Sequence, residues 1–194
     1  MPNTHVPELI PALPELFLAV IIMALLMFGV FQKGGRDEQD VTTFRYVTYM
    51  GILALLLALL LTTLLGGERL VTFGGMFVSD GYAVFCKILV LLASAGSLVI
   101  ARGFLERQSL ARFEFPILVV FATLGMLMMI SANDMIALYL GLEIQSLSLY
   151  IIAAFQRDDT RSTEAGLKYF VLGAVASGML LYGMSLVYGF SGST

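Results

Sequence analysis

Six long apolar stretches limit what this chain can fold into. A helix needs about 20 apolar residues to cross a hydrocarbon core about 30 Å thick. The chain is 59% hydrophobic and 13% charged, whereas soluble domains have about 45–50% apolar and about 25% charged residues. One soluble core cannot hide six such stretches. We therefore predict an all-α integral membrane protein, with residues 1–194 forming one transmembrane domain of six helices over about 14–31, 45–65, 80–101, 113–130, 134–155 and 163–189.

The basic residues predict how these helices are oriented. Cytoplasmic loops of membrane proteins carry an excess of Lys and Arg. The connections after the first, third and fifth helices hold eight cations, whereas those on the other side hold only Arg69. This asymmetry predicts an N-terminus outside the cell and cytoplasmic loops that contain Lys33, Arg36, Arg45, Arg102, Arg107, Arg112, Arg157 and Arg161.

The composition also excludes several classes of function. One cysteine, Cys86, allows no internal disulfide, and with the single histidine, His5, it gives no set of ligands for a transition metal or haem. The 11 Lys and Arg residues are scattered and the net charge is −3, so no nucleic-acid partner is expected. The lipid bilayer is the expected surrounding.

One carboxylate lies in the middle of an apolar stretch. At about 1.5 Å per residue, Glu143 is about 14 Å from Asp134 and about 21 Å from Arg157, which places it near the middle of the bilayer. An ionisable group at that depth costs about 2.5–3.5 kcal/mol and marks a functional site by default. A structural carboxylate that joins helices through a buried hydrogen bond is the alternative, although glutamine would do that with less cost.

Polar residues accompany Glu143 along one face of its helix. Positions three, four and seven apart share a face, so Tyr139, Ser146 and Tyr150 align with the carboxylate. Their hydroxyls are able to hydrogen-bond it or to hold water. We expect these three residues to support proton exchange at Glu143.

A lysine lies on the following helix. Lys168 is about 10 Å along the axis from Arg161, and Glu164 precedes it by four residues, so a local ion pair is expected. A lysine at this depth either functions inside the bundle or extends to the interface. The small-residue pairs Gly173–Ser177 and Ala174–Gly178 indicate a helix that is closely approached by neighbours, which favours an interior position for Lys168.

Three further charged residues lie close to helix ends. Lys87 is about 10 Å from Asp80, so extension of its side chain to the outer surface is as plausible as a function within the membrane. Glu15 is expected to be an interfacial capping carboxylate, favoured by the helix dipole. Asp80 and Asp134 are expected to cap the third and fifth helices.

These residues together describe what a proton path requires: titratable groups, hydroxyls and space for water. The chain shows no nucleophile with an adjacent base and no phosphate-binding loop. The residues alone do not identify the reaction that would drive proton movement.

Three segments of the sequence resemble a known family. They are LGLEIQSLSLY at 140–150, STEAGLKYFVLGA at 162–174 and YGFSGST at 188–194, and Pro14–Glu15 fits the family's first helix. The chain resembles, over essentially its whole length, the N subunit of bacterial NADH-quinone oxidoreductase, respiratory complex I. The related L and M subunits and cation/proton antiporters usually have Trp before the glutamate, whereas this chain has Leu142, which favours the N type.

The resemblance implies a role for the chain. Antiporter-like subunits of this family move protons outward across the bacterial cytoplasmic (inner) membrane, coupled to electron transfer from NADH to quinone. The glutamate of their fifth helix corresponds to Glu143 and the lysine of their sixth helix to Lys168. NADH, FMN, iron–sulfur clusters and quinone are expected on partner subunits, with no cofactor on this chain. The expected partners are other complex I membrane subunits, including an M-type neighbour and the small K-type subunit.

One departure from the family pattern concerns length. Family members have more than twice this number of helices, so the chain is expected to be the N-terminal part of a longer antiporter-like subunit. Two other functions stay open: a stand-alone Na⁺/H⁺ antiporter and a membrane scaffold that conducts no ions. Transport by the purified protein without redox partners would identify the former.

Overall fold

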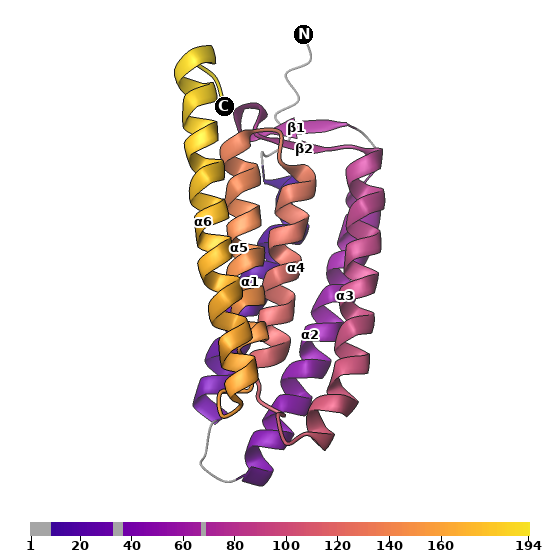
Figure 1. Cartoon of the computed structure of the whole chain (residues 1–194). Coiled ribbons are helices and arrows are strands. Elements are labelled where there is room, and N and C mark those ends of the chain that lie inside the picture. The colour runs from indigo at the N-terminus through magenta and orange to yellow at the C-terminus, as the bar shows by residue number, and fades with distance from the viewer. Residues whose placement is uncertain (1–8, 33–36, 67–68) are drawn as a thin grey trace.

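The computed structural model describes residues 9–32, 37–66 and 69–194. In this part of the chain six long helices run side by side, and a short hairpin lies at one end (Figure 1). All six helices are long and apolar enough to cross a membrane, which confirms the predicted fold class. They are α1 (Leu13–Gln32), α2 (Asp37–Leu65), α3 (Gly81–Arg107), α4 (Glu114–Ser131), α5 (Met135–Ala153) and α6 (Thr160–Ser191).

Helix α4 is at the centre of the bundle. It packs against α1, α2, α3 and α5, whereas α6 packs against α5 at the edge (Figure 1). Half of the most apolar window of α4 is buried, compared with none of that of α6. The core is built from aliphatic side chains of the first four helices, among them Leu18, Leu55, Leu98 and Leu127. The surface outside this core is also strongly apolar, as expected for helices surrounded by lipid.

Two helices extend further than the sequence predicted. The segment 32–44 was expected to be a loop, but α2 begins at Asp37, and α3 continues to Arg107 instead of ending near residue 101. The extensions pack on each other, because the buried ring of Phe44 contacts Leu105. The other four helices begin and end within three residues of the predicted positions.

A β-hairpin replaces the loop expected at residues 66–79. Strands β1 (Leu70–Thr72) and β2 (Phe77–Ser79) pair antiparallel, and the turn between them includes Gly74 and Gly75, whose positive φ angles suit glycine. Asn133, in the α4–α5 connection, donates its backbone N–H to Met76 O at 2.9 Å and its side-chain amide to Gly75 O at 2.8 Å. These bonds stabilise strands that are too short to persist alone.

Aspartates begin three of the helices. Asp80 accepts the backbone N–H of Ala83 at 2.8 Å, and Asp134 accepts those of Ile136 and Ala137 at 2.8 and 3.2 Å, so both predicted caps are confirmed. The Thr194 hydroxyl also donates to Asp134. That bond, helped by the two backbone N–H groups, lowers the pKa of the Asp134 carboxyl. Asp159 caps α6 in the same way.

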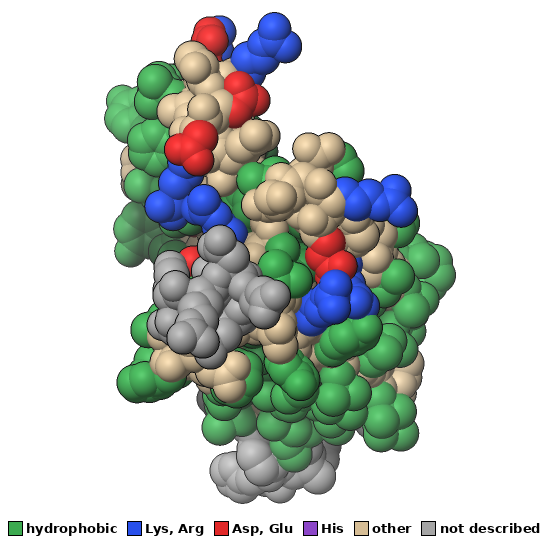
Figure 2. Space-filling view, turned by 90° about the horizontal axis from the view of Figure 1, so that it is seen from below, with side chains coloured by type: hydrophobic (Ala, Val, Ile, Leu, Met, Phe, Trp, Pro, Cys, Tyr) green, Lys and Arg blue, Asp and Glu red, His purple; other side chains and the backbone are tan. Residues whose placement is uncertain are grey.

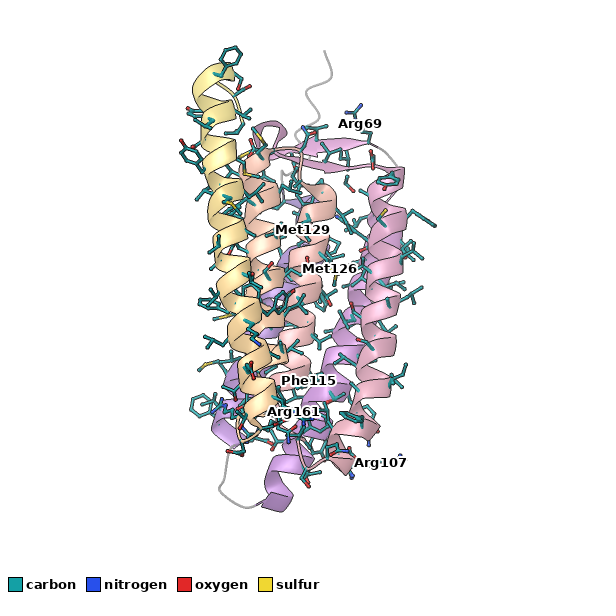
Figure 3. All side chains as sticks on the ribbon, in the orientation of Figure 1. Arg69, Arg107, Phe115, Met126, Met129 and Arg161 are labelled. Carbon is teal, nitrogen blue, oxygen red and sulfur yellow. The ribbon has the colours of Figure 1, made fainter. Side chains whose placement is uncertain are left out.

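The basic residues gather at one end of the bundle. Arg107 and Arg161 lie at the end away from the hairpin, whereas Arg69 lies beside it (Figure 3). Seen from that end, Lys and Arg side chains surround the tips of the helices and hydrophobic side chains cover the flanks (Figure 2). The predicted clustering of cations is therefore present, and the side of the membrane that it faces stays a prediction. Lys33, Arg36 and His5 lie outside the described residues.

Candidate functional site

Glu143 lies near the middle of α5 and faces α6. Its Oε1 accepts a hydrogen bond from the Ser177 hydroxyl, and Ser177 Oγ lies 2.9 Å from the Tyr139 hydroxyl. A serine hydroxyl carries one proton, so when Ser177 donates to the carboxylate, Tyr139 must donate to Ser177. The three side chains therefore form a directed hydrogen-bond chain, from Tyr139 through Ser177 to Glu143.

The predicted polar face of α5 is largely the face that meets α6. Tyr150 packs edge-on against Tyr169, with ring centroids 4.8 Å apart, and against Phe170 at 5.7 Å. Its hydroxyl occupies the space where Gly173 has no side chain. Ser146 is half-buried and has no side-chain hydrogen bond among the described residues, so no hydrogen bond joins it to the carboxylate there.

Ser177 was not expected to be a site residue. The sequence pointed to it only as part of a small-residue pair with Gly173. That pair does face α5, because Gly173 receives the Tyr150 ring and Ser177 bonds Glu143. The prediction that a neighbouring helix closely approaches this pair is therefore confirmed, and the Ser177 hydroxyl supplies the polar contact.

Lys168 lies away from this contact. Its Nζ is 2.6 Å from Glu164 Oε1, which confirms the predicted i,i+4 pair, but the two side chains are 69% and 59% exposed. The interior position inferred from the small residues of α6 is wrong within the described chain. Lys168 is five residues from Gly173, or about 140° around the helix, so the face that packs on α5 does not include it.

Lys87 and Glu15 form a second, fully buried site. Lys87 Nζ lies 2.6 Å from Glu15 Oε1, and their side chains are only 2% and 7% exposed. The ammonium also lies 5.0 Å from the centre of the Phe77 ring, a favourable cation–π arrangement. Both simpler expectations are therefore wrong: Lys87 does not extend to the surface, and Glu15 is not an interfacial cap. Sequence reasoning missed the pair because its partners lie on different helices, α1 and α3.

The site between α5 and α6 has the elements of a proton-exchange site. A carboxylate in an apolar helix pair is able to hold or release a proton, and adjoining hydroxyls are able to pass it on. Among the described residues there is no group of three or more His, Cys, Asp or Glu side chains placed to hold a metal ion.

The fold and site define a class of protein: a multi-pass helical membrane protein with ionisable side chains inside its bundle. Residues 132–194 match the sequence profile of the family described as NADH:quinone oxidoreductase/Mrp antiporter, TM. The chain is 59% identical over 187 residues to NADH-quinone oxidoreductase subunit N of Paramagnetospirillum magneticum, and the match covers 96% of this chain. It is 57% identical to subunit N of Parvibaculum lavamentivorans, with 97% covered. The chain belongs to the NADH-quinone oxidoreductase subunit N family.

Solved structures agree with this assignment. A chain of respiratory complex I from Thermus thermophilus superposes with a TM-score of 0.75 and 32% identity, over 93% of this chain and 37% of that chain. A chain of an archaeal membrane-bound sulfane sulfur reductase, at 18% identity and a TM-score of 0.63, covers 95% of this chain and 37% of that chain and shares the fold. The present chain spans about 37–38% of the length of the two subunit N relatives.

Proposed function

We propose that this chain is the N-terminal part of a proton-translocating subunit of a bacterial NADH:quinone oxidoreductase. The observation that carries the proposal is the hydrogen-bond chain that joins Tyr139, Ser177 and Glu143 within the α5–α6 helix pair. The carboxylate at the end of this chain, Glu143, is the residue that the resemblance assigns to proton transfer. The relatives with the highest identities given above are named as subunits of the same oxidoreductase.

The proposal assigns redox chemistry to other subunits. NADH oxidation and quinone reduction would take place there, on FMN and iron–sulfur clusters, and would drive outward proton movement through this subunit. Its partners would include an M-type antiporter-like neighbour and the small K-type subunit in the bacterial cytoplasmic membrane. Glu143 would carry the proton, Tyr139 would donate toward it through Ser177, and Tyr150 and Ser146 would complete that face.

The two lysines have different places in this scheme. Lys168 is paired with Glu164 and faces away from α5. Its side chain would therefore interact electrostatically with parts of the assembly beyond the helices described here. Lys87 is neutralised by Glu15 in the interior, so its contribution would be to the electrostatic field of the bundle.

The test replaces Glu143 with Gln in the full subunit. A glutamine keeps a hydrogen-bond acceptor for Ser177 but cannot take up a proton, so we expect NADH-driven proton pumping by inverted membrane vesicles to be lost while the complex still assembles. Asp158→Asn, which removes an exposed carboxylate from the α5–α6 connection, is the matched control and should pump normally. Normal pumping by an assembled Glu143→Gln complex would refute the role of this carboxylate.

A second function, Na⁺/H⁺ exchange, is favoured by one observation: the matching family profile also includes Mrp antiporters. It predicts exchange driven by a pH gradient in proteoliposomes that lack NADH and quinone. The Glu143→Gln variant also separates both functions from a scaffold that conducts no ions, since a scaffold would lose assembly and stability instead of transport.

A further inference from the structure

Three buried oxygen atoms at the hairpin end of the bundle lack a hydrogen-bond partner among the described residues. They are Glu15 Oε2, Thr72 Oγ1 and Ser131 Oγ. Glu15 is 6% exposed and Ser131 is 1% exposed, so both side chains lie inside the bundle. A buried polar group without a partner is costly, and the great majority of such groups in proteins bond to protein or to ordered water. These atoms therefore indicate a bound partner that the described residues do not supply.

The three side chains are gathered around Phe77 of strand β2. Thr72 is the register partner of Phe77, so the two side chains share one face of the hairpin. Ser131 directly precedes the residue that forms an isolated β-bridge with Phe77. Lys87 Nζ lies 5.0 Å from the centre of the Phe77 ring and 2.6 Å from Glu15 Oε1. Each unpartnered oxygen is thus connected to the same ring through one or two contacts.

The elements that carry these residues meet at this end of the bundle (Figure 1). Glu15 is in the first turn of α1, Lys87 is in the second turn of α3, and Ser131 is the last residue of α4. Helix α4 packs against both α1 and α3, and strand β2 contacts α3 and α4. Helical side chains tilt toward the helix N-terminus, so the Lys87 ammonium is directed toward the hairpin. The unpartnered oxygens therefore lie in one polar region beneath the hairpin.

The chemistry of this region selects a neutral partner that both donates and accepts hydrogen bonds. An ionised carboxylate oxygen such as Glu15 Oε2 only accepts, whereas the hydroxyls of Thr72 and Ser131 both donate and accept. Glu15 and Lys87 already balance each other in charge, so a further ion would bring an uncompensated charge into the interior. Water meets both conditions, and a buried water typically bonds to about three polar groups.

We propose that the Glu15–Lys87 pair holds buried water, which bridges the Glu15 carboxylate to the hydroxyls of Ser131 and Thr72. The water joins α1, α4 and the hairpin at the point where Lys87 joins them to α3. This site is separate from Glu143 and does not depend on the proton transfer proposed there.

A cryo-EM map of the complex that contains the full subunit, at a resolution that shows ordered water, tests the site directly. We expect density for water at about 2.5–3.2 Å from Glu15 Oε2 and from the two hydroxyl oxygens. A protein side chain bonded to Glu15 Oε2 would overturn the proposal. So would an absence of density between these atoms in a map that shows other buried water.

The sign of a stability change provides a second test. Removal of a hydroxyl that bonds water loses a hydrogen bond, whereas removal of a hydroxyl without a partner relieves an unsatisfied buried group and is stabilising. Ser131→Ala and Thr72→Val should therefore each lower the melting temperature of the purified complex, as measured by fluorescence-detected size-exclusion chromatography of the tagged subunit.

Ser148→Ala is the matched control for Ser131→Ala. Ser148 is 3% exposed, and its hydroxyl donates to Ile144 O within α5 at 2.8 Å, so its removal breaks no link between elements. Ser131→Ala should lower the melting temperature by more than Ser148→Ala does. An unchanged or raised melting temperature in Ser131→Ala or in Thr72→Val would refute the water bridge.

Discussion

At the scale of single residues, Lys87 and Glu143 differ in the kind of partner that each has inside the helix bundle. Lys87 is buried with a carboxylate partner that neutralises it. Glu143 receives instead a hydroxyl hydrogen bond and has no cation within ion-pair distance among the described residues. Lys87 thus has a fixed countercharge, whereas the partner of Glu143 among the described residues is the Ser177 hydroxyl. Proton exchange at Glu143 stays our proposal.

The Glu15–Lys87 pair gives a prediction about stability. Removal of one member of a buried ion pair leaves an uncompensated charge and costs about 3–5 kcal/mol. Glu15→Gln and Lys87→Met, each alone, should therefore lower the thermal stability of the detergent-purified complex, as measured by fluorescence-detected size-exclusion chromatography. The double variant Glu15→Gln/Lys87→Met should recover most of the loss, because no charge is then buried.

A matched exposed pair provides the control for that experiment. Glu164 and Lys168 are separated by the same 2.6 Å between charged atoms but are mostly exposed, so Glu164→Gln should change stability by less than about 1 kcal/mol. Equal effects of the two single substitutions, Glu15→Gln and Glu164→Gln, would show that burial does not govern the energetics of the Glu15–Lys87 pair.

At the scale of helices and strands, sequence reasoning located the helices well and their extensions poorly. Apolar length fixes the part of a helix that lies in the bilayer, and every predicted span is present. The extensions of α2 and α3 depend on contacts between distant residues, Phe44 with Leu105 and Arg45 with Glu106, which no local pattern records. The hairpin was missed for the same reason, since its strands have three residues each and are held by Asn133.

For the candidate site, the sequence predicted the residues on α5 but not their partners on α6. The spacing of Tyr139, Glu143 and Tyr150 placed them on one face, and the structure has that face against α6. The identity of their partners required three-dimensional information. Ser177 is 34 residues from Glu143 in the sequence. Its position in a small-residue pair indicated close packing, and nothing in the sequence showed that its hydroxyl donates to the carboxylate.

The crossing of α4 and α5 gives a prediction at this scale. A Cβ atom added at Gly141 would lie 2.8 Å from Met129 Cγ and 2.9 Å from Gly125 O, and backbone cannot move as a side chain can. Gly141→Ala should therefore push α5 from α4 and destabilise the protein by about 1–3 kcal/mol. The thermal unfolding of the purified complex would measure this effect.

Gly178→Ala on α6 is the matched control. A Cβ atom there meets nothing within 4 Å in the described structure, and alanine favours a helix over glycine by about 0.5–1 kcal/mol. This variant should be neutral or slightly more stable. A neutral Gly141→Ala would show that the α4–α5 crossing relaxes without cost.

At the scale of the whole molecule, the two ends of the bundle differ in charge. The cation-rich end contains Arg107 and Arg161, and the opposite end contains the hairpin and Arg69 (Figure 3). A bias of this kind sets topology in a membrane, so we expect the hairpin outside and the α5–α6 connection in the cytoplasm.

Cysteine labelling measures that orientation. In a Cys86→Ser background, Asp158→Cys should react with a membrane-impermeant maleimide in inverted vesicles and not in right-side-out ones. Val71→Cys, on the exposed strand β1, should show the reverse. The opposite pattern for both positions would invert the topology.

The attachment of the hairpin to Asn133 has a mechanical consequence. Backbone hydrogen bonds connect the α2–α3 hairpin to the α4–α5 connection at one end, whereas side-chain ion pairs that salt weakens join α2 to α3 at the other. The hairpin therefore ties the α2–α3 pair to the α4–α5 pair at one end by hydrogen bonds that do not depend on exposed charges.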